Sequence, residues 1–446
     1  MECEWVNVAS VTPVGGRNRR PEACVHPLPD IIRAWWRPAL GVAWLLAVAF
    51  LTLQPAGMRL EEFGRIPELC LFCGTRGAGD AILNVVMFVP LGLVLGGRSR
   101  SLGAIMLVGA ALSTGIELGQ VFVPGRSSSP ADVLWNGLGA GLGGLVHARI
   151  AARVSGRARA GALPWLAALL LTLPVLGILA TPAPTEDDYW GQWAPDLGHM
   201  PQYSGAVLEA DLDGAPLLSG RIPEPGPHRA LLEKDWTLSG RIEVGPAPRG
   251  VSPIVSIYDG QQREILVVGA HREDMVYRER RLAHDLLLEA PDVRVTDAFD
   301  DRADGDTVTI GARRANGILC LSLDATEWCG LGITPGRTWG YLLYLEGPPE
   351  WFRRLLDAVW LAMLFFPIGL FAGTRREAVI GGAVGVVALL ATVAFTPLVA
   401  GAPLVFALEC LAGATGAAAG WAVLAFLRRA ADPRQSGVPA SIATNH

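Results

Sequence analysis

The chain has 446 residues, of which 51% are hydrophobic and only 18% are charged, and its mean hydropathy is +0.35. This composition excludes an ordinary soluble globular protein of this length and predicts an integral membrane protein. The formal net charge is −5, and no run of lysine and arginine is long enough for a nucleic-acid surface, so we expect no nucleic-acid partner.

Apolar runs of spanning or near-spanning length divide the chain. They cover residues 38–54, 81–97, 103–122, 131–148, 161–181, 355–373, 378–398 and 402–427. The predicted fold class is a multi-pass α-helical membrane protein of about eight spans, with an all-β domain inserted between the fifth and sixth. We interpret the first run as an uncleaved anchor, because no convincing small-residue cleavage site follows it and further spans do.

Basic residues fall on every second loop. Arginines precede the first run and follow the second, fourth, sixth and last runs. By the positive-inside rule both termini are expected in the cytoplasm, and loops 55–80, 123–130, 182–350 and 399–401 are expected to face outward. The predicted segments are a poorly ordered cytoplasmic tail (1–36), a membrane domain with a fifth span (37–181), an outward domain (182–350), a three-span segment (351–428) and a second tail (429–446).

Polar side chains interrupt the apolar sequence between residues 80 and 144. They are Asp80, Asn84, Glu117, Gln120, Arg126, Asp132 and Asn136. Ionisable groups at membrane depth are costly and by default mark a site. Most of them form pairs three or four residues apart, so each pair shares a helix face near the outer end of its span. We predict an outward-facing pocket for a polar or charged head group. The alternative is a buried network that staples the spans together, with Arg126 neutralising Glu117 or Asp132.

Two functions fit this cluster. We favour a non-enzymatic cell-envelope protein that binds an amphiphile, such as a lipid-linked glycan, a phospholipid or a glycopeptide. The alternative is a membrane-embedded hydrolase or transferase acting on a lipid-linked substrate, with Glu117 or Asp132 as general acid or base and Arg126 holding an anionic group. No Ser/His, Cys/His or metal constellation accompanies the cluster, so we expect no cofactor and no metal.

An ordered pattern of residues runs through this stretch. Asn84 is followed by FxPxG (Phe88, Pro90, Gly92), then by Ile116, Glu117, Gln120, Gly125, Arg126, Asp132, Asn136 and the Gly137–Gly139 triplet. Over about 110 residues, to about His147, the chain resembles the VanZ-like membrane family. The resemblance implies a protein of the bacterial inner membrane. Because the family is named for a teicoplanin resistance factor, it also implies a link to glycopeptide or envelope-stress resistance. It assigns no chemical role to these residues, and the large outward domain argues against transferring the phenotype.

The sixth run repeats the second at a constant offset of 277 residues. Asp357, Phe365, Pro367, Gly369 and Arg375 match Asp80, Phe88, Pro90, Gly92 and Arg98, and the register continues to Glu409 opposite Asp132 and Gly416 opposite Gly139. We predict a degenerate four-plus-four duplication with both halves in one orientation. In the second copy Ala394, Pro397, Pro403 and Gly413 replace Glu117, Gln120, Arg126 and Asn136, so we interpret it as a scaffold.

The outward segment has the pattern of an antiparallel β-sandwich. Short alternating runs such as AVLEADL, WTLSGRIEV, REILVVGA, DTVTIGARR and WGYLLYL are separated by turn signals, and their order resembles a laminin-G or concanavalin-A-like jelly roll. The resemblance implies a cell-wall glycan or a protein as partner. Trp236, Tyr258, Tyr277 and Trp339 are interpreted as core, with sugar stacking as the alternative. The acidic run at 297–306 is interpreted as an exposed loop, with calcium binding as the alternative.

Two cysteine pairs fall in outward segments. Cys320 and Cys329 flank a predicted hairpin, where a structural disulfide fits. For Cys70 and Cys73 we favour a local disulfide or two free thiols. The alternative for that pair is redox chemistry or half of a metal site.

Overall fold

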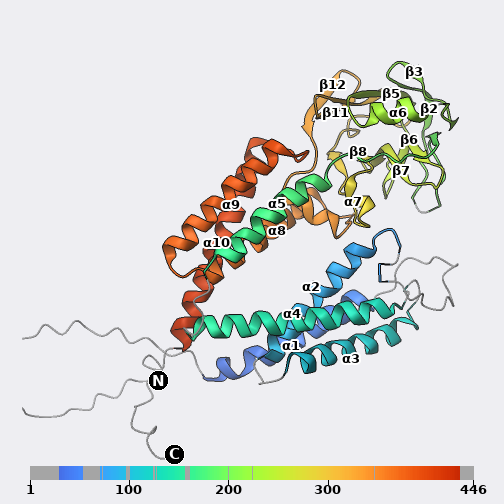
Figure 1. Cartoon of the computed structure of the whole chain (residues 1–446). Helices are drawn as coiled ribbons and strands as arrows, with labels where there is room; N and C mark the ends of the chain where they lie inside the picture. Colours follow the sequence, from blue (N-terminus) through green and yellow to red (C-terminus); the bar gives the residue numbers. More distant parts are fainter. Residues whose placement is uncertain are drawn as a thin grey trace, which may run out of the picture.

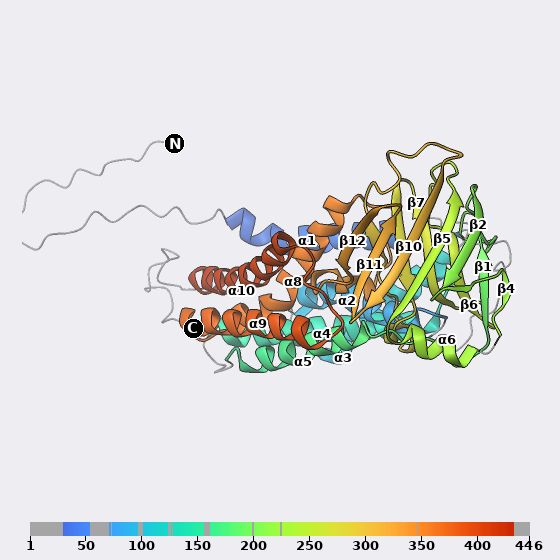
Figure 2. The same cartoon turned by 90° about the horizontal axis from the view of Figure 1, so that it is seen from above.

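The computed structural model describes residues 30–53, 71–72, 74–96, 101–123, 126, 128–155, 161–198, 200–223, 225–345 and 347–431. Residues 1–29 and 432–446 of the two predicted tails, together with Cys70 and Cys73, lie outside these ranges, while residues 30–36 and 429–431 are helical. The described helices form two groups that diverge from a common end, and the strands form a β domain at the other end of both groups (Figures 1 and 2).

The first bundle consists of four helices. They are α1 (Asp30–Thr52), α2 (Gly77–Leu95), α3 (Leu102–Gln120) and α4 (Pro130–Val154). Glycines bring α2 and α4 into backbone contact: a Cβ at Gly139 would overlap the backbone of Val85, and a Cβ at Gly92 would overlap that of Ala140. The glycine-rich run of α4 therefore serves close helix packing.

The second bundle repeats this packing. Its helices are α5 (Leu163–Leu179), α8 (Glu350–Phe371), α9 (Arg375–Phe395) and α10 (Pro403–Ala431). A Cβ at Gly416 would overlap the backbone of Ala362, and a Cβ at Gly369 would overlap that of Ala417. Each contact lies 277 residues beyond one in the first bundle. The duplication itself stays a prediction.

Every predicted apolar run contains a helix, and most of these helices are long. Five described segments are long and apolar enough to cross a membrane: Gly77–Leu95, Leu102–Gln120, Glu350–Phe371, Arg375–Phe395 and Pro403–Arg429. Gly41–Phe50 and Leu163–Leu179 are shorter apolar helical segments. These helices indicate a membrane protein. The count of eight spans and the orientation stay predictions.

The β domain consists of two antiparallel six-stranded sheets, in the orders β4-β1-β6-β7-β8-β9 and β12-β11-β10-β5-β2-β3. The strands are β1 (Tyr189–Trp193), β2 (Ala206–Leu212), β3 (Ala215–Pro216), β4 (Gly220–Arg221), β5 (Trp236–Glu243), β6 (Ser252–Asp259), β7 (Glu264–His271), β8 (Asp274–Glu279), β9 (Val293–Val295), β10 (Thr307–Ala315), β11 (Ile318–Leu323) and β12 (Thr326–Leu331). Short helices α6 (Pro225–Leu232) and α7 (Leu282–Asp285) interrupt them. Trp236, Tyr258, Tyr277 and Trp339 are all buried, so none of them offers a ring face for sugar stacking.

One predicted strand is wrong. The WGYLLYL stretch belongs to a 3-10 helix, η3 (Gly336–Tyr341), followed by a turn. Side chains of this region bond to membrane helices: the Trp339 Nε1 donates to Asp357 Oδ1 at 2.6 Å, and the Tyr341 hydroxyl donates to the Leu176 carbonyl at 3.0 Å. These tertiary contacts outweigh the β propensity of the aromatic residues.

Cys320 and Cys329 are joined by a disulfide between β11 and β12. Together with Glu327 they form the one group of described residues whose ligand atoms are close enough for a metal ion. Their sulfurs are already bonded to each other, and we assign no metal there.

The two bundles are joined at both ends. At the end far from the β domain, the Arg153 Nη2 donates to the Ala372 carbonyl at 2.5 Å. At the other end a β-domain segment contacts both bundles, because Glu289 forms an ion pair with Arg76 and Asp292 forms one with Arg353. Arg76 and Arg353 are 277 residues apart.

The Asp292 contact is strongly electrostatic. Burial raises the pKa of Asp292, but the guanidinium groups of Arg294 and Arg353 lower it further than burial raises it, to about 2. Asp292 is therefore ionised at neutral pH, and it holds the β domain to α8.

Candidate functional site

The α3–α4 hairpin positions the first acidic group. Glu117 lies in the last turn of α3 with only 6% of its surface exposed, and its Oε2 accepts the Ser129 backbone N–H at 2.7 Å. Ser129 is the N-cap of α4, so the carboxyl group lies at the positive end of that helix. The Ser128 side chain also hydrogen-bonds to Glu117.

Two further carboxyl groups belong to this site: Asp132 lies near Glu117, and Asp80 lies near Asp132. Asp132 lies in the first turn of α4 and Asp80 in the first turn of α2. Asp132 is close enough to repel both Asp80 and Glu117 electrostatically. Three helices thus bring Asp80, Glu117 and Asp132 together, and we call these residues the acidic cluster. Among the described residues none of the three has an ion-pair partner within 4 Å.

The amides of the predicted set fasten helices. Gln120 Nε2 donates to the Thr52 carbonyl at the end of α1 at 3.1 Å. Asn136 Nδ2 donates to the Ser113 hydroxyl of α3 at 2.8 Å, and both residues are buried. Asn136 Oδ1 is buried without a hydrogen-bond partner in the described structure. Part of the set therefore acts as the predicted staple, and the Asn136 Oδ1 remains available to accept.

Asn84 and Arg126 border this site. Asn84 is half-buried on α2, one turn beyond Asp80. Arg126 is exposed in the connection between α3 and α4. Arg126 interacts with another group of the chain, and its neutralisation of Glu117 or Asp132, which the stapling hypothesis requires, stays a prediction.

In the second bundle Asp357 and Glu409 form an acidic pair at the equivalent positions, and side chains from the end of the β-domain insertion bond to both residues. Arg337 donates from Nε to Asp357 Oδ1 at 3.0 Å and from Nη2 to Asp357 Oδ2 at 3.1 Å. Thr334 donates its hydroxyl to Glu409 Oε1 at 2.5 Å. These donors belong to residues 334–339, which we call the plug.

The plug fits closely over the pair. A Cβ at Gly336 would lie 2.5 Å from Glu409 Oε1 and 2.9 Å from Asp357 Cβ, so glycine permits this approach. Trp360 of α8 donates from Nε1 to the Thr338 hydroxyl at 2.9 Å. Burial lowers the pKa of Arg337, and the carboxylates of Asp357 and Glu350 raise it by more, so that the net pKa lies above its ordinary value.

The plug and the arginine contacts were not predicted from the sequence. Arg337 lies in the insertion, where the offset of 277 no longer aligns comparable segments, so no pattern pointed to it. A signal did exist for Arg76 and Arg353, because they occupy matching positions before Asp80 and Asp357.

Comparison with known proteins identifies one region. Residues 40–151 match the family model described as VanZ/LLP1. The match includes all of the acidic cluster, Asn84, Gln120, Arg126 and Asn136, and it excludes the β domain and the second bundle. It suggests a bacterial cell-envelope protein. No curated protein and no solved structure matches the chain, so the laminin-G-like or concanavalin-A-like resemblance has only the two antiparallel sheets in its support.

Proposed function

We propose that the protein binds the head group of an amphiphile at the acidic cluster, on the outward side of a bacterial cell-envelope membrane. The head group carries several hydrogen-bond donors, as amines, guanidines and sugar hydroxyls do. The ends of α2, α3 and α4 form the site, and α2 and α3 are long and apolar enough to cross a membrane, so a ligand with an alkyl chain can reach it from the bilayer.

The main support for this proposal is the set of hydrogen bonds that the plug makes with the acidic pair of the second bundle. In the second bundle, a guanidinium and an indole N–H donate to Asp357 and a hydroxyl donates to Glu409 Oε1, while Glu409 Oε2 is buried without a hydrogen-bond partner in the described structure. The packing of α2 on α4 recurs in that of α8 on α10, so the pair Asp80 and Asp132 occupies a comparable place. We infer that the first pair takes the same kinds of donor groups from an external molecule.

The electrostatics of the cluster support the same ligand class. Asp132 repels both Glu117 and Asp80, and because Glu117 is buried and Asp132 is half-buried, leaving their carboxyl oxygens without donors costs free energy. Ser128 and Ser129 donate to Glu117, and Arg76 attracts Asp80 electrostatically while it is ion-paired with Glu289. A donor-rich head group would satisfy the carboxyl oxygens, and the deeper Asn136 Oδ1 could accept another donor.

The test is binding of a defined probe to the full chain. Dodecylguanidinium supplies the guanidinium group of Arg337 on an alkyl chain, and dodecyltrimethylammonium supplies charge without N–H donors. In phosphatidylcholine nanodiscs we expect saturable binding of the first probe and weaker binding of the second. Asp132→Asn should lower the affinity about tenfold, since a charge-assisted hydrogen bond is lost.

The matched control is Glu409→Gln, the equivalent position in the second bundle, which the plug already covers. It should leave probe binding unchanged. If the wild type shows no saturable binding, or if Asp132→Asn binds as the wild type does, the proposal fails and the staple hypothesis explains the cluster. Incubation with lipid extracts checks the enzymatic alternative: a product made by the wild type and not by Glu117→Gln would replace a binding function with catalysis.

A further inference from the structure

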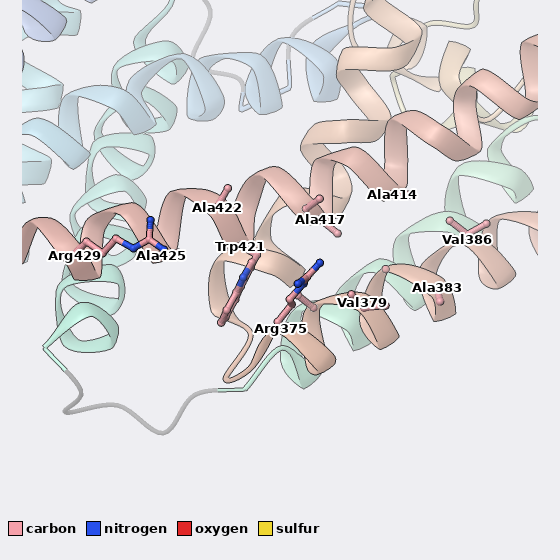
Figure 3. A pocket seen from close by; sticks show the side chains of 13 residues that line it. Arg375, Val379, Ala383, Val386, Ala414, Ala417, Trp421, Ala422, Ala425 and Arg429 are labelled. Carbon is pink, nitrogen blue, oxygen red and sulfur yellow. The ribbon is translucent and has the colours of Figure 1, made fainter. Parts of the chain in front are cut away.

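A groove of about 750 Å³ lies between α9 and α10 of the second bundle (Figure 3). This volume falls in the range of small-molecule sites, roughly 300–1,000 Å³. Its walls are mostly alanine, glycine and valine, with Trp421 as the one aromatic ring among the lining residues. It has no part in the acidic cluster or the plug.

The first bundle shows why the groove exists. There, α3 fills the equivalent space with large side chains: a Cβ at Gly141 of α4 would lie 2.7 Å from Met106 Cγ, and a Cβ at Gly144 would lie 2.8 Å from Ile105 Cδ1. At the offset of 277 residues, Ala383 takes the place of Met106 and Gly382 that of Ile105. On the facing helix, Ala418 and Trp421 stand in the places of Gly141 and Gly144, and both line the groove that remains between α9 and α10.

The ends of the groove differ in charge. Arg375 is the first residue of α9 and Arg429 lies in the last turn of α10, and because the helices form a hairpin both lie at the same end. Both side chains are exposed. From Arg429 to Ala414 the lining residues of α10 cover about 22 Å of helix, which is more than half of the roughly 30 Å hydrocarbon core of a bilayer.

We propose that this groove binds one acyl chain of an anionic phospholipid, with the lipid phosphate at Arg375 and Arg429. Its walls are apolar and belong to membrane-crossing helices, so the surrounding bilayer supplies the occupant. Figure 3 shows Arg375 beside Trp421 and Arg429 further along α10, beyond Ala425, and each guanidinium offers bidentate donors to a phosphate. The site is separate from the proposed head-group site and does not depend on it.

The experiment uses the full chain in phosphatidylcholine nanodiscs that contain a phosphatidylglycerol with a photoreactive diazirine in its acyl chain. After irradiation, mass spectrometry measures labelling of α9 and α10. We expect Ala383→Met, which restores the side chain of the first bundle, to lower labelling about fivefold by filling the groove. The control Ala391→Met adds the same bulk at an exposed position of α9 outside the groove and should leave labelling unchanged.

A second pair of variants tests the phosphate contact without altering the walls. Arg375→Gln combined with Arg429→Gln should reduce the preference for labelled phosphatidylglycerol over labelled phosphatidylcholine about threefold or more. The neighbouring Arg376→Gln, which does not line the groove, should preserve that preference.

The proposal is overturned if Ala383→Met labels as the wild type does, or if the wild type labels equally with both lipids. Cross-links between two copies through α9 and α10 would also overturn it, because another chain would then fill the groove. Asp132→Asn should not change the labelling, which separates this site from the acidic cluster.

Discussion

In the first bundle Asp80 and Asp132 repel each other, and neither has an ion-pair partner among the described residues. In the second bundle Asp357 and Glu409 occupy the equivalent positions and are bonded to Arg337, Trp339 and Thr334. Glycine contacts fix the helix packing in both bundles, so the packing does not account for the difference. The difference comes from the β-domain insertion, which supplies a cation and two further donors to one pair only.

The two bundles also differ in the space between their last two helices, and here it is the first bundle that is filled. Between α3 and α4 the first bundle is filled by Ile105 and Met106, while the second bundle has a groove at the matching place. The second bundle therefore combines a plugged acidic pair with a groove, whereas the first bundle has no plug from the β domain on its acidic pair and large side chains in place of the groove.

The largest effect is expected when the filled pair loses its cation. Arg337→Gln leaves the buried Asp357 without its guanidinium and should lower the free energy of unfolding by about 3 kcal/mol. The measurement is the denaturation midpoint of the full chain in detergent. Arg241→Gln, which breaks an exposed pair with Glu209, is the matched control and should cost less than about 1 kcal/mol. Equal losses in the two variants would contradict the role of the plug.

The docking of the β domain should depend on pH through His284. Burial and, to a smaller extent, the neighbouring arginines lower the pKa of His284 from 6.5 to about 4, against a hydrogen bond with Arg281 that raises it. A depressed folded-state pKa means that the stabilisation is complete above pH 6.5 and is lost as the pH falls from 6.5 towards 4, by at most roughly 3 kcal/mol. His284→Asn keeps a hydrogen-bond acceptor near the Arg281 N–H and should flatten the pH dependence of the midpoint in this window. An unchanged slope would show that another group titrates.

The equivalence of the bundles can be tested at their glycines. Gly92→Ala and Gly369→Ala each place a methyl group against the backbone of the partner helix, and each should cost about 2 kcal/mol. Gly115→Ala has no atom within 4 Å of its new Cβ, so it should gain about 0.5 to 1 kcal/mol from helix propensity. Thermal midpoints of the three variants provide the comparison. If only one of the first two variants is destabilised, the bundles do not pack alike.

The smallest effect on stability is expected at the acidic cluster. Glu117→Gln keeps an oxygen that can accept the Ser129 N–H and removes a charge that Asp132 repels. Its midpoint should therefore stay within about 1 kcal/mol of the wild type, while dodecylguanidinium binding weakens. A large loss of stability with unchanged binding would favour the staple hypothesis.

The helices were predictable because apolar runs of this length have few alternatives. Their ends were less so: α1 begins at Asp30, well before its apolar run, and α4 continues to Val154. Most of the sandwich strands followed from their alternation. The η3 segment did not, because its aromatic residues are buried against membrane helices that lie far away in the sequence.

The convergence of Asp80, Glu117 and Asp132 also followed from helix spacing and loop order. The sequence could not predict whether other side chains of the chain cover each acidic pair or fill the space between the helices. Arg337 covers Asp357 only because the chain returns from the β domain at that point, and the groove opens only because Ala383 and Gly382 stand where larger residues stand in the first bundle. Both depend on contacts between segments that no local pattern connects.

The most direct test of the central claim counts bound dodecylguanidinium per chain by native mass spectrometry in nanodiscs. The wild type should bind one saturable probe at the acidic cluster. A variant with Arg337→Ala and Trp339→Ala should bind a second, because the pair Asp357 and Glu409 is then open to the same donors. An unchanged count in the variant, or no saturable probe on the wild type, would contradict the equivalence of the two acidic sites.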